Sequence, residues 1–358
     1  MRICYVAHSG DHFVPAYVDY FCAAGHEVHL VSLYHADLPN AVNHHPINDP
    51  DFDPMKASWA YFWALPKVRR TIRRIRPDIV HAHYVPSNGM MAASAGVHPL
   101  VITAHGSDVH YALKHPIKRR AILYALRRAD LVNAVSRGLE DKILSLGVPP
   151  SRILRLTLGI DTGQFVGLRS ERRPGPVRII CTRKMGPVYQ CEAIVRATAV
   201  LVARGLEFEL TFAAGGPEEA ELREQVRHLG LDGYVTFLGG YRLSELPPML
   251  ADADIYVSAS LSDGTSLSLL EAMASGAFPV VSDIPANREW LTGHGDGLLF
   301  DPPNHEQLAD CLARAIGNDQ LRHTAVEANR RRVLAEGDRQ ANMRTLASHY
   351  ERLTAKIG

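Results

Sequence analysis

The chain has 358 residues, of which 46% are hydrophobic and 22% charged, a composition typical of soluble globular proteins. Its length exceeds a single typical core, so we expect two domains. Residues 1–170 carry 19 basic and 13 acidic side chains, a net of +6, whereas residues 171–358 carry a net of −5. The basic excess is too small and too dispersed for a nucleic-acid-binding protein.

Neither a membrane span nor a secretion signal is expected. No apolar run approaches the roughly 20 residues that a transmembrane helix needs. Met1–Ala7 leads directly into a strand-like run rather than a signal peptide. Five scattered cysteines without zinc-like CxxC spacing indicate reduced thiols. We therefore expect a cytosolic protein whose only membrane contact is peripheral.

The first part of the chain alternates strands and helices. A buried strand is predicted at residues 3–7, a helix at 15–24 that Gly25 ends, and a strand over HEVHLVSL. A basic helix is predicted at 67–76, ended by Pro77. Further strands are predicted over DIVHAH, PLVITA, DLVNAVS and RILRLTLGID. This β-α-β alternation predicts a parallel sheet with helices on both faces.

The same alternation restarts after a polar segment. Residues 167–176 contain proline and glycine and suit an interdomain linker. Predicted strands and helices then follow in the order VRIICTR, residues 192–204, FELTFAAGG, residues 218–229, YVTFLGG, DIYVSAS, residues 266–275 and PVVSD. We expect an α/β protein of two doubly wound domains, residues 1–166 and 177–338. A final helix, residues 339–358, is expected to cross back to the first domain.

Residues suited to ligand binding follow several predicted strands directly. They are Ser9-Gly10, His105-Gly106, Gly215-Gly216 and Asp263–Ser268. Doubly wound sheets bind ligands outside the carboxyl ends of their strands. Two such edges facing each other would form an interdomain cleft, which is the usual place for a substrate.

The stretch SDGTSLSLLEAMASG, residues 262–276, combines two acids with a predicted helix start. If Ser266 or Ser268 is the N-cap, Glu271 lies about one turn inside the helix and Asp263 lies in the loop before it. Free amides at a helix N-terminus favour an anionic ligand group. Taken alone, the stretch is more typical of a surface loop that leads into an ordinary amphipathic helix.

Taken in order, the motifs of both halves resemble those of the retaining glycosyltransferases of the GT-B fold, family four of the sequence classification. In the first half they are HAHY, TAHGSD, ADLVNAVS and LGIDTGQF. In the second half they are AAGGPEEAELREQVRHLGL, VTFLGGYRLSELPPMLADADIYVSAS and SDGTSLSLLEAMASGAFPVVSDI. The last contains the family's paired acids, an acid followed after seven residues by Glu.

The resemblance implies roles by position. Glu271 would accept hydrogen bonds from the ribose of a nucleoside-diphosphate sugar, and Asp263 would hold hydroxyls of the transferred sugar. Arg183 would pair with the diphosphate as charge builds on the leaving group. The implied catalytic residues are His105, Arg183 and Asp263, and the other implied donor-binding residues are Gly10, Gly106, Lys184, Gly215, Gly216, Gly264, Thr265, Ser266, Leu267 and Glu271. The implied chemistry needs no metal ion and no cofactor besides the sugar nucleotide.

Three positions depart from the family pattern. The first acid is Asp263 rather than Glu. Six residues after Arg183, where the family usually has Lys, this chain has Tyr189. Lys184 is a candidate substitute, although neighbours in a strand point to opposite faces. The first loop reads HSGDHF and lacks the Gly-Gly of many members, so we expect altered contacts to the acceptor or the phosphate there.

Residues 59–76 combine aromatic and basic side chains. They include Trp59, Tyr61, Phe62, Trp63, Arg69, Arg70, Arg73, Arg74 and Arg76. A basic amphipathic helix beside aromatic residues suits a membrane interface with anionic lipid, or a lipid-linked acceptor. The same residues fit a structure in which the aromatics fill a core and the arginines form a solvated face. Both interpretations stay open.

Other histidines are given structural interpretations. His44 and His45 are expected in a surface loop, because proline, asparagine and aspartate surround them. His81 and His83 are expected on opposite sides of a strand, where they would make a poor metal pair.

The ordered motifs predict a cytosolic, metal-independent, retaining glycosyltransferase. It would move a sugar from a UDP- or GDP-linked donor to a hydroxyl of a saccharide, a lipid-linked molecule or a small molecule. Two alternatives stay open: a glycosyl phosphorylase on the same scaffold, and a non-catalytic homologue that acts as a scaffold or regulatory subunit. The sequence does not identify the base, the sugar, the acceptor or the oligomeric state.

Overall fold

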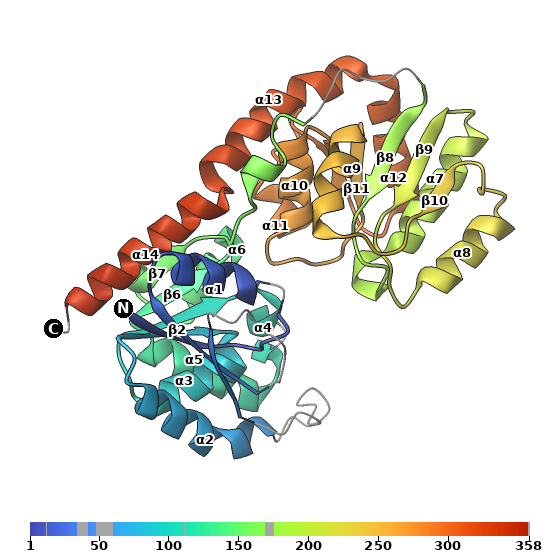
Figure 1. Ribbon diagram of the computed structural model, residues 1–358. Coiled ribbons are helices and arrows are strands. Elements are labelled where there is room, and N and C mark those ends of the chain that lie inside the picture. The colour runs from blue at the N-terminus through green and yellow to red at the C-terminus, as the bar shows by residue number, and fades with distance from the viewer. Residues whose placement is uncertain (12, 34–41, 48–59, 111, 169–174, 357–358) are drawn as a thin grey trace. The chain divides into compact units, whose positions relative to one another are not determined.

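The computed structural model describes residues 1–358 apart from 12, 34–41, 48–59, 111, 169–174 and 357–358 (Figure 1). The chain divides into two compact units. Unit 1 comprises Met1–Leu158 and Ala341–Gly358, and unit 2 comprises Gly159–Gln340. Most of the predicted linker, residues 167–176, lies outside the described residues.

Unit 1 is built on a seven-stranded parallel sheet in the order β3-β2-β1-β4-β5-β6-β7. The strands are β1 (Arg2–Val6), β2 (Glu27–Ser32), β3 (Asn43–Pro46), β4 (Ile79–His83), β5 (Leu100–Ala104), β6 (Leu131–Ala134) and β7 (Ile153–Arg155). Strands β4 and β5 are buried along their whole length. This is the pattern of a parallel sheet that helices cover on both faces.

The helices of unit 1 follow the strands in alternation. They are α1 (Val14–Ala23), α2 (Ala60–Ile75), α3 (Met90–Ala95), α4 (Ser107–His110), α5 (Pro116–Arg128), α6 (Arg137–Ser145) and most of α14 (Arg339–Ala355), with short turns η1 (Val85–Gly89), η2 (Ala112–Lys114) and η3 (Pro150–Arg152). Tyr350 of α14 is fully buried in unit 1, 3.5 Å from the hydroxyl of Tyr5. The end of the chain therefore completes the first core.

Two predictions about the secondary structure of unit 1 are wrong. Helix α2 begins at Ala60 instead of Lys67, and Pro66 lies inside it. His44 and His45 lie in the edge strand β3 instead of a loop. There Nε2 of His45 is 3.0 Å from Nδ1 of His29 in β2. An edge strand pairs on one side only, so a polar segment can form it.

Unit 2 has a six-stranded parallel sheet in the order β10-β9-β8-β11-β12-β13. The strands are β8 (Val177–Cys181), β9 (Phe208–Phe212), β10 (Val235–Phe237), β11 (Ile255–Ser258), β12 (Phe278–Ser282) and β13 (Leu298–Phe300). The helices are α7 (Cys191–Ala203), α8 (Glu219–His228), α9 (Leu246–Asp252), α10 (Leu267–Ser275), α11 (Pro285–Arg288), α12 (His305–Gly317) and α13 (Asp319–Glu336), with turns η4 (Thr162–Gln164), η5 (Pro187–Tyr189) and η6 (Leu243–Glu245). The sequence analysis missed β13.

The sheet of unit 2 separates two hydrophobic cores. Ile179 and Cys181 of β8 face the core that contains α7 and α12, and Ile180 faces the core that contains α9 and α10. Both units are thus parallel α/β layers, which confirms the predicted fold class. Among the described residues, no helix combines the length and the apolar character needed to cross a membrane.

Candidate active site

The strand order of unit 2 has a switch point between β8 and β11. From this point β9 and β10 extend to one side, and β12 and β13 to the other. Doubly wound sheets bind ligands at the carboxyl ends of the strands beside such a point. Arg183 follows β8 by two residues, and Asp263 follows β11 by five. Two predicted site residues therefore lie in the two loops where the fold favours a ligand.

The guanidinium of Arg183 connects these two loops. Its Nη2 donates to Oδ2 of Asp263 at 2.8 Å, and its Nη1 donates to Oγ of Ser268 at 2.8 Å. The side chains of Arg183 and Asp263 are only 12% and 18% exposed. The Nε of Arg183 is buried and has no hydrogen-bond partner among the described residues. The side chains of Arg183 and Asp263, both predicted to bind the ligand, therefore bind each other in this structure.

Ser268 was predicted only as part of the segment Asp263–Ser268, with no role of its own, and Tyr256 was not predicted. The hydroxyl of Tyr256, in β11, donates to Oγ of Ser268 at 2.9 Å. Oγ of Ser268 thus accepts from both Tyr256 and Arg183, which fixes the guanidinium against α10. The position of Ser268 inside the acid-rich motif was a signal for it. No sequence signal identifies Tyr256, because it resembles the other apolar residues of its buried strand.

Tyr189 places an aromatic face where the family usually has a lysine. Its ring centroid lies 4.4 Å from Cζ of Arg183, within the range of a cation–π contact. Lys184, the candidate substitute, is exposed and makes no hydrogen bond or ion pair with a described residue. The ring of Tyr189 therefore contacts the guanidinium of Arg183 at the position where the family's lysine would repel it.

Helix α10 begins where the motif predicts. Ser266 is its N-cap residue, and Gly276, with φ of 89°, ends it in the left-handed conformation that glycine tolerates. The side chain of Ser266 makes no capping hydrogen bond. The first-turn amides of Leu267 and Ser268 have no intrahelical acceptor by geometry. Hydrogen-bond donors and the positive end of the helix dipole thus lie beside Arg183.

Glu271 lies about one turn inside α10. Burial raises the pKa of its carboxyl to about 7, while the positive charges of Arg339 and Arg183 act to lower it. Burial also raises the pKa of the Tyr241 phenol, and the carboxylate of Glu271 raises it further. Arg183, Glu271, Arg339 and Tyr241 therefore share one electrostatic environment. Neither Arg339 nor Tyr241 was predicted from the sequence.

The raised pKa of Glu271 predicts a pH-dependent stability. Between its ordinary value of 4.5 and about 7 the folded carboxyl holds a proton that the unfolded one has lost. The free energy of unfolding therefore falls as pH rises through this window, by up to about 3 kcal/mol from this group. Glu271→Gln removes the titration. We expect the Tm of the variant, relative to that of the wild type, to be higher at pH 8 than at pH 5. The difference should be about 2–4 °C for each kcal/mol of unfolding free energy that the wild type loses.

Differential scanning calorimetry of the two proteins at both pH values measures this effect. Other titrating groups change the absolute Tm values of both proteins equally, so the difference between them isolates Glu271. An identical Tm difference at pH 5 and pH 8 would contradict the assignment.

Gly216 packs against the loop that carries Arg183. A Cβ at this position would lie 2.1 Å from the backbone oxygen of Met185 and 2.6 Å from its nitrogen. The backbone of Met185 also donates to Gly215 O at 3.1 Å and accepts from Glu218 N at 3.2 Å. The glycine thus lets two backbone loops approach each other, whereas the resemblance implied an approach to the ligand.

Gly216→Ala is therefore expected to lower the free energy of unfolding by about 1–3 kcal/mol or more, because overpacking forces backbone to move. Gly215→Ala is the matched comparison. Its Cβ would lie 3.1 Å from Oε2 of Glu219, the far end of a side chain, and 4.0 Å from the backbone carbon of Gly239, which is an ordinary contact. Urea denaturation of both variants measures the difference, and equal stability of the two would show that the Met185 contact does not matter.

The predicted residues of unit 1 lie at the carboxyl ends of β1 and β5. The imidazole of His105 stacks on Phe13 with ring centroids 4.3 Å apart, and its Nε2 lies 3.1 Å from Nδ1 of His83. Gly106 has φ of 111°, which only glycine adopts readily. Gly10 is exposed. Since the carboxylate of Asp108 accepts the N–H groups of His105 and Gly106 at 3.0 and 2.9 Å, this loop is held in a fixed form.

The prediction that His81 and His83 lie on opposite sides of the strand is wrong. Their rings stack with centroids 4.5 Å apart, because residues two apart in a strand point to the same face. Nε2 of His81 lies 2.7 Å from Oγ1 of Thr103, and burial lowers the pKa of both imidazoles. Among the described residues, no group of three or more His, Cys, Asp or Glu side chains has the arrangement of a metal site.

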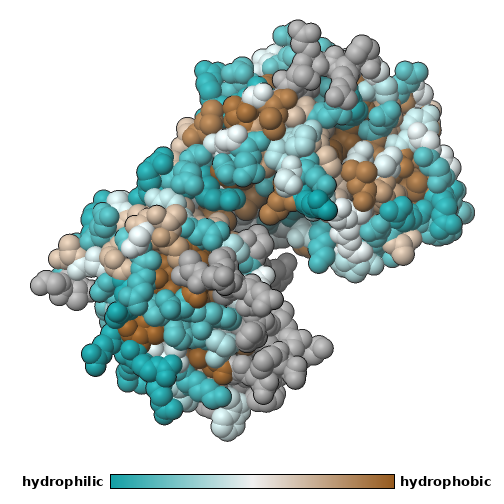
Figure 2. Space-filling view, viewed as in Figure 1, coloured by the Kyte–Doolittle hydropathy of each residue, from teal (hydrophilic) through white to brown (hydrophobic). Residues whose placement is uncertain are grey.

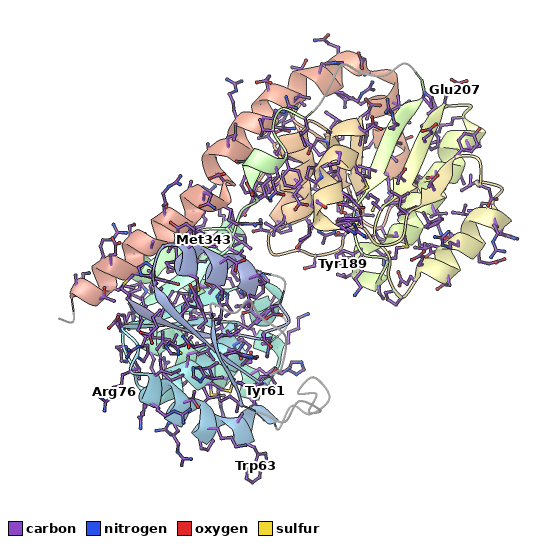
Figure 3. All side chains as sticks on the ribbon, in the orientation of Figure 1. Tyr61, Trp63, Arg76, Tyr189, Glu207 and Met343 are labelled. Carbon is purple, nitrogen blue, oxygen red and sulfur yellow. The ribbon has the colours of Figure 1, made fainter. Side chains whose placement is uncertain are left out.

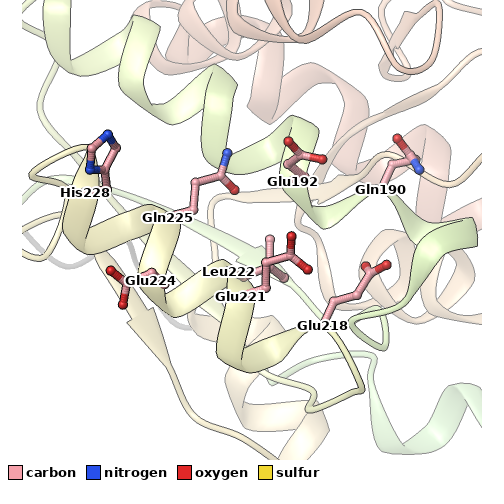
Figure 4. A pocket seen from close by; sticks show the side chains of 8 residues that line it. All are labelled: Gln190, Glu192, Glu218, Glu221, Leu222, Glu224, Gln225 and His228. Carbon is pink, nitrogen blue, oxygen red and sulfur yellow. The ribbon is translucent and has the colours of Figure 1, made fainter.

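A cavity of about 620 Å³ in unit 2 contains none of the predicted site residues (Figure 4). Its lining includes the four carboxylates Glu192, Glu218, Glu221 and Glu224. Like charges disfavour an anionic ligand. This cavity is therefore a poor site for a diphosphate, unlike the loops that hold Arg183.

Comparisons with known families cover both halves of the chain. Residues 169–332 match the family described as glycosyl transferases group 1. Residues 14–164 match the family described as glycosyltransferase family 4. The two matched regions lie mainly in unit 2 and unit 1, respectively.

Individual relatives agree with these matches. A Salmonella typhimurium protein, WcaL, a glycosyltransferase assigned to colanic acid biosynthesis, is 30% identical over 76% of this chain and 70% of its own. The amylovoran biosynthesis glycosyltransferase AmsK of Erwinia amylovora is 24% identical over 96% of this chain and 97% of its own. The structure of Anabaena HepE in complex with UDP superposes with a TM-score of 0.80 at 18% identity, over 99% of this chain and all of that one. The last likeness shows the fold.

Proposed function

The chain belongs to glycosyltransferase family 4 and is a glycosyltransferase, and we propose that it moves a sugar from a UDP- or GDP-linked donor to an acceptor hydroxyl, with retention of configuration and without a metal ion. Two relatives are named for colanic acid and amylovoran biosynthesis. This supports an acceptor that belongs to glycan, glycolipid or small-glycoside assembly.

The donor diphosphate is placed against Arg183 and the first turn of α10. One observation carries this assignment: a largely buried guanidinium, with its Nε unpartnered among the described residues, lies at the switch point of the sheet. Fixed donors of this kind stabilise the negative charge that develops on a departing phosphate. A helix N-terminus adds backbone N–H groups to the same charge.

Glu271 and Asp263 act as binding groups. The carboxylate of Glu271 accepts hydrogen bonds from the ribose hydroxyls. When the donor binds, its diphosphate replaces Asp263 as the partner of Arg183. The carboxylate of Asp263 is then available for hydroxyls of the transferred sugar. Asp is one methylene shorter than the family's usual Glu, and this shortening suits the 2.8 Å pairing with Arg183.

Retention follows if the departing phosphate accepts the proton of the acceptor hydroxyl on the face it leaves. The glycosyl–phosphate bond breaks, the bond to the acceptor oxygen forms on the same face, and the proton goes to the phosphate. Asp263 and Glu271 need not act as the acid and base of a hydrolase in this scheme. His105 of unit 1, which the resemblance implies as a catalytic residue, stays a proposed residue of the transfer site.

Incubation with a panel of UDP- and GDP-sugars and hydroxyl acceptors tests the proposal. We expect release of UDP or GDP together with a glycoside of the donor's anomeric configuration, in the presence of EDTA. Disaccharide cleavage that depends on inorganic phosphate and needs no nucleotide would instead support a phosphorylase. If no nucleotide binds and no sugar moves across the panel, the chain is a non-catalytic homologue.

We also propose that the protein works in the cytoplasm, at the inner face of a membrane, through residues 59–76. The side chain of Trp63 is 70% exposed and points away from α2 (Figure 3). The surface over α2, located in Figure 1, is mostly hydrophilic with smaller hydrophobic patches (Figure 2). Trp59 and the side chain of Phe62 lie outside the described residues. Co-sedimentation with anionic vesicles is expected, and absence of any lipid-dependent binding would refute this contact.

A further inference from the structure

Unit 1 contains a cavity of about 630 Å³ that the proposed sugar transfer does not use. It lies among α2, α3 and α5, which Figure 1 shows side by side against the sheet. Four arginines line it: Arg69 and Arg73 from α2, and Arg120 and Arg128 from α5. The hydroxyl-bearing Ser94 of α3 also belongs to the lining.

Among the described residues, no carboxylate neutralises these four arginines. Residues 60–76, 90–95 and 109–129, which contain the three helices, include neither Asp nor Glu. Within the part of the chain that the structure describes, none of the four makes an ion pair. Like charges around one cavity raise each other's energy and lower the energy of an anion between them.

The partners that two of these arginines do have are neutral. Nε of Arg73 donates to the carbonyl oxygen of Ala95, at the end of α3, at 2.9 Å. Cζ of Arg128 lies 4.8 Å from the ring centroid of Tyr124. Such contacts orient a guanidinium and leave its charge uncompensated. A planar guanidinium binds the oxygens of a phosphate group through two parallel hydrogen bonds.

An exposed hydrophobic side chain continues the cavity-facing stripe of α5. Ala121, Tyr124 and Arg128 line the cavity, and Ile117 precedes Ala121 by four residues, so all four lie on one face of the helix. Ile117 is 81% exposed and Tyr124 is 37% exposed. Soluble phosphate gains nothing from an exposed isoleucine. A phosphate that carries an acyl or prenyl chain gains the burial of apolar surface.

We propose that this cavity binds the phosphate headgroup of a membrane lipid, with the lipid chain directed toward Ile117. The site lies wholly in unit 1 and is distinct from the diphosphate site around Arg183 in unit 2. It goes beyond the contact proposed for residues 59–76, because it assigns a defined pocket that needs α5 as well as α2. It does not depend on sugar transfer.

Two double variants test the proposal in the full chain. Arg69→Ala with Arg120→Ala removes two cavity arginines. Arg70→Ala with Arg119→Ala removes the same charge from adjacent exposed positions on the same helices that do not line the cavity. Binding is measured by sedimentation with phosphatidylcholine vesicles that contain phosphatidic acid, and by calorimetry with inorganic pyrophosphate.

We expect the cavity variant to bind the vesicles about 30-fold more weakly than the wild type, and the control variant less than about 5-fold more weakly. Ile117→Ser is expected to weaken vesicle binding without changing pyrophosphate binding. Equal losses in the two double variants would overturn the site and leave a diffuse basic surface. Pyrophosphate binding that needs Arg69 and Arg120, without vesicle binding, would overturn the lipid assignment.

The test separates this proposal from the proposed activity. Sugar transfer to a soluble acceptor is expected to remain unchanged in both double variants, because neither changes a residue of the proposed transfer site. If the wild-type protein transfers no sugar, the proposed activity is refuted, and the vesicle-binding result still tests the lipid site.

Discussion

Replacing Arg183 by alanine is expected to lower the rate of sugar transfer by about 10²–10³-fold, the usual effect of removing one fixed donor to a developing oxyanion. The effect is at the upper end of this range because the second cation of the family is absent. Tyr189 occupies its place, and Lys184 is exposed and makes no ion pair among the described residues. Steady-state release of UDP or GDP measures the change.

Arg178→Ala is the matched control. Arg178 lies in β8, the strand that Arg183 follows, and pairs with Asp252, which is 46% exposed, so this ion pair is worth about 0–1 kcal/mol. We expect its transfer rate to stay within twofold of the wild type. Arg183→Lys keeps the charge but loses the double contact to Asp263 and Ser268, and is expected to be intermediate. Full activity of Arg183→Ala would rule out its role on the diphosphate.

Glu271→Ala is expected to weaken donor binding by about 10–150-fold, the range for a hydrogen bond to a charged group, 1.5–3 kcal/mol. Acceptor binding is expected to change little. The structural reason is that Glu271 lies in α10 of unit 2, where the positive charges of Arg183 and Arg339 act on its carboxylate. The dissociation constants of UDP and GDP, measured by calorimetry, test the donor part.

Glu192→Ala provides the comparison for this variant, because Glu192 is an exposed residue of α7 whose carboxylate pairs with Arg196. Its nucleotide affinity should equal that of the wild type. A larger effect of Glu271→Ala on the KM for the acceptor than on nucleotide binding would overturn the assignment of Glu271 to the ribose.

The fold was predictable because strand and helix patterns in this chain are strong and local. Buried β-branched runs such as VRIICTR form strands, and helix α10 begins at the serine that the motif indicated. Strand β3 was missed because its stability comes from pairing with β2 instead of from its own polar sequence. A prediction made from local pattern cannot include a neighbour that is far away in the chain.

The candidate site was predictable in its positions and not in its contacts. The motif order placed Arg183 and Asp263 in loops that follow strands, and Glu271 about one turn inside the helix that begins at the same edge. The pairing of Arg183 with Asp263, 80 residues later, depends on two loops that only the folded sheet brings together. The contact of Tyr189 with Arg183 likewise needs the turn η5, which no hydrophobic periodicity of the sequence predicts.

Calorimetric titration with UDP and with GDP tests the central claim most directly, because that claim places a nucleoside diphosphate on Arg183 and Glu271 of unit 2. We predict that wild-type protein binds at least one of the two nucleotides with one-to-one stoichiometry, and that Arg183→Ala and Glu271→Ala each weaken this binding at least tenfold. Absence of binding to both nucleotides, or equal affinity in the wild type and both variants, would contradict it.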